Sequence, residues 1–349
     1  MITFIGVGVL FIQSNFSRLV ALLLLLLGLS TLFWDNIVFF EKPRVVHKSA
    51  RTPVLNLLLL LALFWYGQYF FNAGGLVLFL EDSETLRINL SAGKGEFILL
   101  STAVLYVDIF YRRAMRIFAF TLFVLVYFIL IIGIGWRSPG MYFLIWAFLT
   151  RASTERSNVN IKIRHGLIGV FLLLFSSYIG LIRAGIPVKK IGDLLWNIRH
   201  LFIVNISNLE KVVEYTDRTF YRLGWTYLND LSVSLPGLGT KFTGVNMKAW
   251  TNSHFEGETM TLTLPGELYL NFGLFGLVIL VLFFPMFIRL SESYLLASGK
   301  DIHAFLWVAL AIFLFRISTG GIMPILIFQL IPLLLIYFLT KIRYAKNIG

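Results

Sequence analysis

The stretch IFAFTLFVLVYFILIIGIG, residues 117–135, decides the fold class, because it carries no charged residue and has about the length of a membrane-spanning helix. Inside a bilayer the backbone must satisfy its own hydrogen bonds, so such a run is predicted to be a helix. The whole chain has the same character: of its 349 residues, 58% are hydrophobic and 14% are charged. Soluble globular proteins have about 45–50% apolar and about 25% charged residues, so the composition predicts one polytopic membrane protein.

Comparable apolar runs recur along the chain, and together they predict about ten membrane helices. The runs lie at residues 2–12, 19–39, 54–71, 97–110, 117–135, 141–149, 167–182, 268–288, 305–317 and 322–339. The predicted fold is therefore all-α and polytopic, forming a single integrated domain. Its parts are N-terminal membrane helices (1–184), a large external loop (185–266) and C-terminal membrane helices (267–349).

Lysine and arginine distinguish the two sides of the membrane. One set of alternate loops holds about 16 of them, whereas the short loops of the other set hold about 4. Because cytoplasmic loops are rich in these residues, the basic set and the C-terminus are predicted to be cytoplasmic. Much of the net charge of +12 follows from this bias, and we expect no nucleic-acid partner. The basic residues on that side are Lys42, Arg44, Lys48, Arg51, Arg112, Arg113, Arg116, Arg151, Arg156, Lys162, Arg164, Arg289, Lys300, Lys341, Arg343 and Lys346.

The external loop contains two segments with the pattern of amphipathic helices. Residues 188–204 carry apolar side chains at helical spacing, and residues 220–235 are aromatic and apolar. Such helices either lie on the outer membrane surface or pack over the mouth of a cavity. A long ordered loop is usually functional, so the loop is expected to contribute to the site.

Three arginines at the predicted external face are candidates for binding a pyrophosphate: Arg137, Arg183 and Arg316. Arginine presents a planar fork of donors to anions, and charge buried near a membrane usually serves an ion or a substrate. Arg218 and Arg222 in the loop are further candidates. The alternative is that each guanidinium extends to lipid phosphates or to backbone carbonyls.

Three residues of the late loop and the following helix are candidate catalytic acids or bases: His254, Glu258 and Glu267. An imidazole titrates near neutral pH, so His254 is the first candidate. The alternatives are an inert loop histidine and, for Glu267, an acid that interacts favourably with a helix dipole. The acidic pair Glu81 and Asp82 lacks the supporting ligands of a metal site, so we expect no metal. The chain also lacks cysteine and the phosphate-binding loops of nucleotide-dependent enzymes, so we expect no cofactor.

Aromatic side chains around the loop are candidates for stacking on sugar rings. They are Trp225, Tyr227, Trp250 and Tyr269. The alternative is that they form part of the aromatic belt at the membrane interface. Nearby, Asn271, Gly273 and Gly276 are predicted to let their helix pack closely against a neighbour.

Short motifs accompany this arrangement of helices and one large external loop. They are GWRS at 135–138, GWTYL at 224–228 leading to LP at 235–236, and GETMTLT at 257–263 leading to GELYLNFGLFG at 266–276. In layout and motifs the chain resembles the bacterial oligosaccharide repeat-unit (O-antigen) polymerases over nearly its whole length. The motif at 266–276 is the most specific.

The resemblance implies a metal-independent, GT-C-like glycosyltransferase in the bacterial inner membrane, with its active site facing the periplasm. A hydroxyl of a new lipid-linked repeat unit attacks the anomeric carbon of the growing chain, and undecaprenyl pyrophosphate leaves. The implied partners are undecaprenyl-pyrophosphate-linked glycans, membrane lipids and a chain-length regulator protein.

Two other functions stay open. An O-antigen ligase has a similar layout and transfers the finished glycan to the lipid A core. A flippase or transporter is the other, although transporters favour internal repeats and charged or broken helices at the midplane of the membrane.

Overall fold

The computed structural model describes residues 52–80, 86, 95–135, 137–153, 163–183, 186–199, 209, 212–213, 216, 222–228, 264–297, 300–317 and 322–341. All regular secondary structure within these residues is helical, as the sequence predicts. The labelled elements are α3 (Pro53–Ala73), η1 (Val77–Phe79), α5 (Gly95–Arg112), α6 (Ile117–Gly133), α7 (Arg137–Ala152), α8 (Ile163–Arg183), α12 (Leu264–Ala297), α13 (Asp301–Ile317), α14 (Ile322–Ile325), η2 (Leu326–Leu330) and α15 (Ile331–Lys341).

The chain divides into two compact units. The bundle unit comprises Arg44–Asn197, Gly299–Ile312 and Phe328–Gly349, and the motif unit comprises Met1–Pro43, Ile198–Ser298 and Phe313–Ile327. The single integrated domain expected from the sequence stays a prediction.

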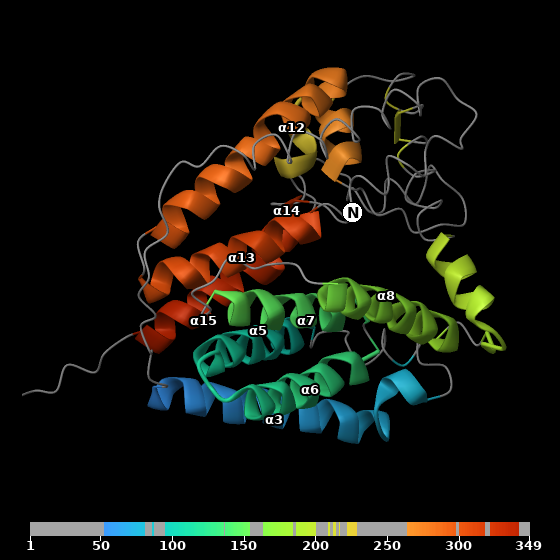
Figure 1. Cartoon of the computed structure of the whole chain (residues 1–349), viewed down its shortest axis with the longest axis vertical. Helices are drawn as coiled ribbons and strands as arrows, with labels where there is room; N and C mark the ends of the chain where they lie inside the picture. Colours follow the sequence, from blue (N-terminus) through green and yellow to red (C-terminus); the bar gives the residue numbers. More distant parts are fainter. Residues whose placement is uncertain are drawn as a thin grey trace, which may run out of the picture. The chain divides into compact units, whose positions relative to one another are not determined.

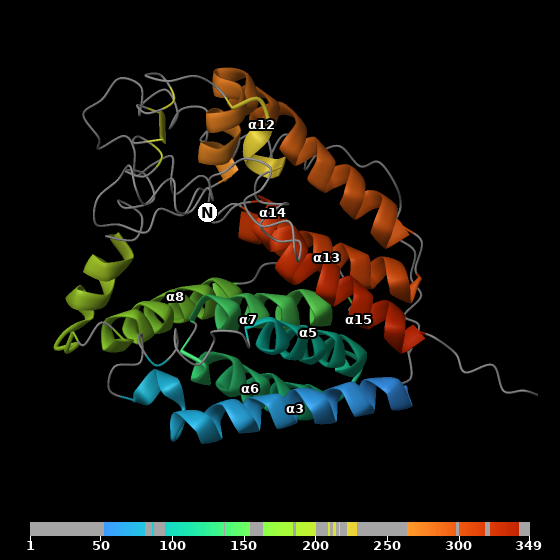
Figure 2. The same ribbon diagram turned by 180° about the vertical axis from the view of Figure 1, so that it is seen from behind.

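Helix α5 is the centre of the bundle unit. It packs against α3, α6, α7 and α15, and Figures 1 and 2 show it among these helices. Residues 103–113 are all buried, so every face of the second half of α5 is covered. A helix that is buried on every face must be surrounded by protein or by lipid, and here the neighbouring helices provide the cover.

Aromatic rings fix helices of the bundle unit that are distant in sequence. Phe305 of α13 stacks on Tyr337 of α15 with 3.8 Å between the ring centroids. Phe110 of α5 meets the Phe305 ring edge-on at 5.0 Å. Such pairs contribute about 0.5–1.5 kcal/mol beyond the area they bury, so they help to hold α5, α13 and α15 together.

Helix α3 begins and ends where the sequence supplies caps. The Oγ1 atom of Thr52 accepts a hydrogen bond from the Leu55 N–H at 3.3 Å, and Pro53 occupies the first helical position. At the other end Gly74 has a φ of +79°, the left-handed conformation that terminates helices. The predicted run at 54–71 therefore lies within one helix of 21 residues.

Two described helices, α3 and α12, are long and apolar enough to cross a membrane. Apolar side chains also point outward: Leu60 of α3 is 66% exposed, and Phe118 of α6 is 81% exposed. Large exposed apolar surfaces mark contact with a membrane or a partner, so these helices are compatible with membrane localisation. Every predicted run within the described residues overlaps at least one helix, and the run at 322–339 covers α14, η2 and α15. The number of about ten spans stays a prediction, and the runs at 2–12 and 19–39 lie outside the described residues.

The two predicted loop helices differ in outcome. Within the segment 188–204, residues 191–199 are helical. Within the segment 220–235, a helix beginning at residue 220 is wrong, because Leu223 and Gly224 have φ values of +50° and +87°. A right-handed helix does not accommodate positive φ, so the helical turn begins only after them.

Candidate functional site

The motif unit is built on α12, which reverses direction at Gly273 (Figure 1). Gly273 has φ +60° and ψ −146°, a conformation essentially confined to glycine. A Cβ atom on Gly276 would lie 2.5 Å from the carbonyl oxygen of Leu268. In a straight helix these residues are about 12 Å apart, so residues 264–272 fold back against the start of residues 274–297.

This reversal corrects two predictions. The run at 268–288 is not one straight spanning helix, because its first residues precede the turn. The small residues Gly273 and Gly276 let α12 pack against its own first segment, whereas the sequence predicts packing against a neighbouring helix. The second segment, about 36 Å long, retains the length needed to cross a bilayer.

Asn271, at the end of the first segment, joins the two motifs GWTYL and GELYLNFGLFG. Its Oδ1 atom accepts a hydrogen bond from the Gly224 N–H at 2.9 Å. Its Nδ2 atom donates to the Thr226 Oγ1 at 2.6 Å and to the Glu267 carbonyl at 2.8 Å. The Asn271 side chain is fully buried, and three hydrogen bonds satisfy most of its capacity.

Backbone contacts reinforce this junction. The N–H groups of Arg222 and Leu223 donate to the carbonyls of Leu270 and Asn271 at 3.1 and 3.0 Å. The last carbonyls of a helix have no partner within the helix, so the loop supplies donors to the end of the first segment. The positive φ of Gly224 produces the tight turn that brings these donors to α12.

Glu267 is a buried carboxylate within the same segment. It is 1% exposed, and its Oε2 accepts a hydrogen bond from the Ile322 N–H at 2.8 Å, at the start of α14. Arg316, in the last turn of α13, belongs to the same unit and is partly exposed. The motif unit therefore contains a fixed carboxylate together with the predicted anion-binding residues Arg222 and Arg316.

The predicted sugar-stacking residues differ in accessibility. Trp225 is 56% exposed on the docked loop. Tyr227 follows in the helical turn, with its ring 6.5 Å from the Phe272 ring. Tyr269 is 2% exposed within an apolar cluster of the motif unit, so in this structure its ring is covered by protein. Of the described candidates, Trp225 presents the largest exposed aromatic surface.

Four predicted site residues lie outside the described residues, and for two further arginines only the backbone is described. The four are Arg218, Trp250, His254 and Glu258, and the two arginines are Arg137 and Arg183. Helix α7 begins at Arg137 and helix α8 ends at Arg183, and both helices belong to the bundle unit. Convergence of these arginines with Arg316 stays a prediction. No group of three potential metal ligands occurs among the described residues.

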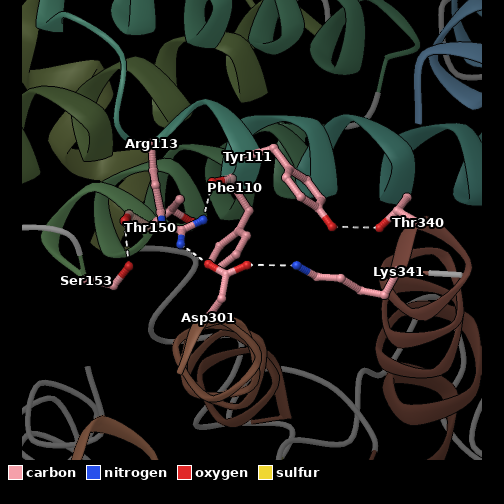
Figure 3. A network of polar contacts seen from close by, with 8 residues as sticks. All are labelled: Phe110, Tyr111, Arg113, Thr150, Ser153, Asp301, Thr340 and Lys341. Atoms are coloured by element: carbon pink, nitrogen blue, oxygen red, sulfur yellow. Dashed lines mark hydrogen bonds and ion pairs between the residues drawn. The ribbon is translucent and has the colours of Figure 1, made fainter. Parts of the chain in front are cut away.

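A second polar cluster lies in the bundle unit (Figure 3). Asp301, the first residue of α13, forms ion pairs with Arg113, just after α5, and with Lys341, the last residue of α15. The Lys341 Nζ is 2.9 Å from the Asp301 Oδ2. The Arg113 guanidinium also donates to the Phe110 carbonyl at 2.9 Å and lies over the Phe110 ring. Three helix ends are therefore tied by one carboxylate.

Burial raises the pKa of the Asp301 carboxyl, but the charge of Arg113 and the hydrogen bond from Lys341 outweigh it. The net effect is a pKa below the usual value for aspartate. The carboxylate is charged at neutral pH, as the two ion pairs require. The sequence interpretation assigns Arg113 and Lys341 only an orienting role and misses their shared acidic partner.

A third ionic contact lies inside α5. Asp108 is fully buried, forms an ion pair with Arg112 and accepts a hydrogen bond from the Tyr127 hydroxyl at 2.7 Å. The Arg112 guanidinium lies 3.5 Å from the centroid of the Phe123 ring. This pair was not predicted, although a spacing of four residues places both side chains on one helix face.

No family model, curated protein or solved structure matches the chain.

Proposed function

We propose that this protein is a membrane glycosyltransferase that polymerises undecaprenyl-pyrophosphate-linked repeat units into O-antigen or a related surface polysaccharide. The site faces the periplasm of a bacterial inner membrane. The acceptor hydroxyl attacks the anomeric carbon of the donor glycan, its proton passes to a base, and undecaprenyl pyrophosphate departs.

The observation that carries the proposal is the junction at Asn271. Two of the motifs on which the resemblance to repeat-unit polymerases rests are joined by its side chain. Gly224 and Thr226, which are 47 and 45 positions before Asn271, meet it there, so the motifs belong to one structural feature. A buried carboxylate, an exposed indole and two arginines in the same unit are chemically suited to a glycan carried on an anionic lipid.

The bundle unit adds support for the predicted topology. Alternation of membrane spans places the end of α5, the start of α13 and the end of α15 on one side. The Asp301 cluster brings these three helix ends together. The same side carries the excess of lysine and arginine, which is the pattern of a cytoplasmic face.

In the proposed reaction, Arg137, Arg183 and Arg316 stabilise the leaving pyrophosphate, with Arg218 and Arg222 as further ligands. A fixed donor aimed at developing negative charge contributes about 2.7–4 kcal/mol, or about 100- to 1,000-fold in rate. His254 is the first candidate for the base, and Glu258 and Glu267 are the others. Trp225, Tyr227, Trp250 and Tyr269 are the candidates for sugar contacts, and the described exposures favour Trp225.

The arginine roles are tested by changing Arg137, Arg183 and Arg316 singly to alanine in the host and separating its surface glycan on a gel. We expect each variant to insert and to lose long-chain glycan. Arg116→Ala is the matched control, because Arg116 is exposed in the bundle unit on the predicted cytoplasmic side. Wild-type chain length in all three variants contradicts the proposed pyrophosphate site.

The reversal of α12 is the observation that favours a transporter, since transporters place broken helices at their binding sites. Deletion of the gene separates the alternatives by product. Loss of the ladder with a single repeat retained on lipid A supports a polymerase. Loss of every repeat unit from lipid A, with the lipid-linked glycan accumulating, supports a ligase or a flippase.

A further inference from the structure

The helix at residues 191–199 follows α8 after a short connection and starts at a defined cap. The Asp193 Oδ2 accepts hydrogen bonds from the N–H groups of Lys189 and Lys190 at 3.0 and 3.1 Å. These hydrogen bonds hold the pKa of Asp193 below its usual value, so the capping carboxylate is charged at neutral pH. A side chain that reaches back to the N–H groups before a helix stabilises the helix start.

One face of this helix is attached to α8. The Ser177 Oγ donates to the Leu194 carbonyl at 2.8 Å, and the Asn197 Nδ2 donates to the Ser177 carbonyl at 3.1 Å. Figure 1 shows the short yellow-green helix beside the end of α8. Ser177 is six residues before the end of α8 at Arg183, which corresponds to about 9 Å along the helix axis.

The opposite face is exposed and predominantly apolar, with Arg199 in the last turn of the helix. Ile191, Leu195 and Trp196 are 67%, 55% and 59% exposed. Lys189 and Lys190, at the start of the helix, are also exposed. An apolar face with tryptophan and adjoining lysines is the composition of helices that lie in a membrane interface.

We propose that residues 191–199 insert this face into the outer leaflet of the membrane, with Lys189 and Lys190 contacting the phosphates of anionic phospholipids. Three observations select lipid as the occupant. The exposed face is predominantly apolar, and the basic side chains of Lys189, Lys190 and Arg199 complement an anionic headgroup. The hydrogen bonds to Ser177 hold the helix about 9 Å along α8 from its end at Arg183. Interfacial helices are buried about 5–10 Å into the boundary between headgroups and acyl chains. The inference rests on the membrane placement of α8 in the proposed function.

The test uses single-cysteine variants, which is direct because the chain has no cysteine of its own. Nitroxide labels are placed by Trp196→Cys, Leu195→Cys and Lys189→Cys in nanodiscs of phosphatidylcholine and phosphatidylglycerol. Collision with oxygen reports lipid, and collision with a water-soluble nickel chelate reports water. We expect the labels at positions 195 and 196 to favour oxygen and the label at position 189 to favour nickel.

The lysine contribution is tested in the same nanodiscs. Lys189→Gln and Lys190→Gln are expected to lower the ratio of inserted to water-exposed label at position 196 by about fivefold each. Removal of phosphatidylglycerol is expected to act in the same direction and to remove the effect of the glutamine variants.

A label on α8 distinguishes failure of this inference from failure of the membrane placement. Phe171 is 63% exposed on α8, so Phe171→Cys reports lipid wherever α8 spans the membrane. Lipid contact at position 171 with water contact at position 196 overturns the inference alone. Exclusion of both probes at position 196 also overturns it, because the face is then covered by protein. Water contact at position 171 overturns the membrane placement itself.

Discussion

Replacing Asn271 by alanine tests the junction between the loop and α12. The change removes three hydrogen bonds from a fully buried side chain. Two partners lose their hydrogen bond, the partly buried N–H of Gly224 and the buried hydroxyl of Thr226. A buried polar group left unsatisfied costs about 1–3 kcal/mol, so we expect docking of residues 222–228 to weaken by about 2–4 kcal/mol.

Hydrogen exchange measures this loss directly at the loop. Weakening by about 2–4 kcal/mol corresponds to exchange about 30- to 700-fold faster at the amides of Leu223 and Gly224. Thr226→Val is the graded control, because it removes one of the three partners of Asn271. It is expected to cost about 1 kcal/mol, or about fivefold.

The order of effects is as informative as their size. Asn271→Ala is expected to speed exchange at Leu223 and Gly224 more than Thr226→Val does. The amides of α3, in the other unit, are expected to exchange as in the wild-type chain. Unchanged protection of Leu223 and Gly224 in Asn271→Ala refutes the reasoning, because the loop is then held by contacts other than this side chain.

Two further predictions concern the stability of the two units. Because the pKa of Asp301 is lowered in the fold, its stabilising effect is complete above about pH 4 and is lost as pH falls through the lower folded value. Thermal unfolding in detergent should therefore show an acid-dependent fall in Tm for the wild-type chain, and a lower but flatter Tm for Asp301→Asn; an equally steep acid fall in the variant contradicts this. For α12, Gly276→Ala places a Cβ atom 2.5 Å from the Leu268 carbonyl oxygen and should destabilise the chain by about 1–3 kcal/mol. Gly67→Ala in α3, where nothing lies within 4 Å, is the control and should stabilise by up to about 1 kcal/mol; equal Tm changes for both glycines count against the folded-back segment.

The helices were predictable because long apolar runs have few alternatives in a bilayer. The run at 117–135 becomes α6, Ile117–Gly133, and the caps at Thr52 and Gly74 delimit α3. The reversal at Gly273 was not predictable in the same way. A single glycine in an apolar run is compatible with a straight helix, and only its positive φ reveals the turn.

The residues of the candidate site were predictable from the sequence, but the hydrogen bonds that join them were not. Glu267, Arg222 and Arg316 follow from residue type and position, whereas the hydrogen bonds of Asn271 span 45 and 47 residues. The helical spacing of apolar residues predicts neighbours on one helix face, not contacts between residues so far apart in the sequence. The Asp301 cluster was missed for a related reason. The positive-inside rule already explains Arg113 and Lys341, so the sequence gives no indication that they share an acidic partner.

Reconstitution of the purified chain tests the central claim most directly. The protein is placed in nanodiscs with an undecaprenyl-pyrophosphate-linked repeat unit from its host, and products are followed by mass spectrometry. We predict glycans longer by whole repeat units, with one undecaprenyl pyrophosphate released for each linkage formed. A folded, inserted chain that leaves the repeat unit unextended contradicts the account.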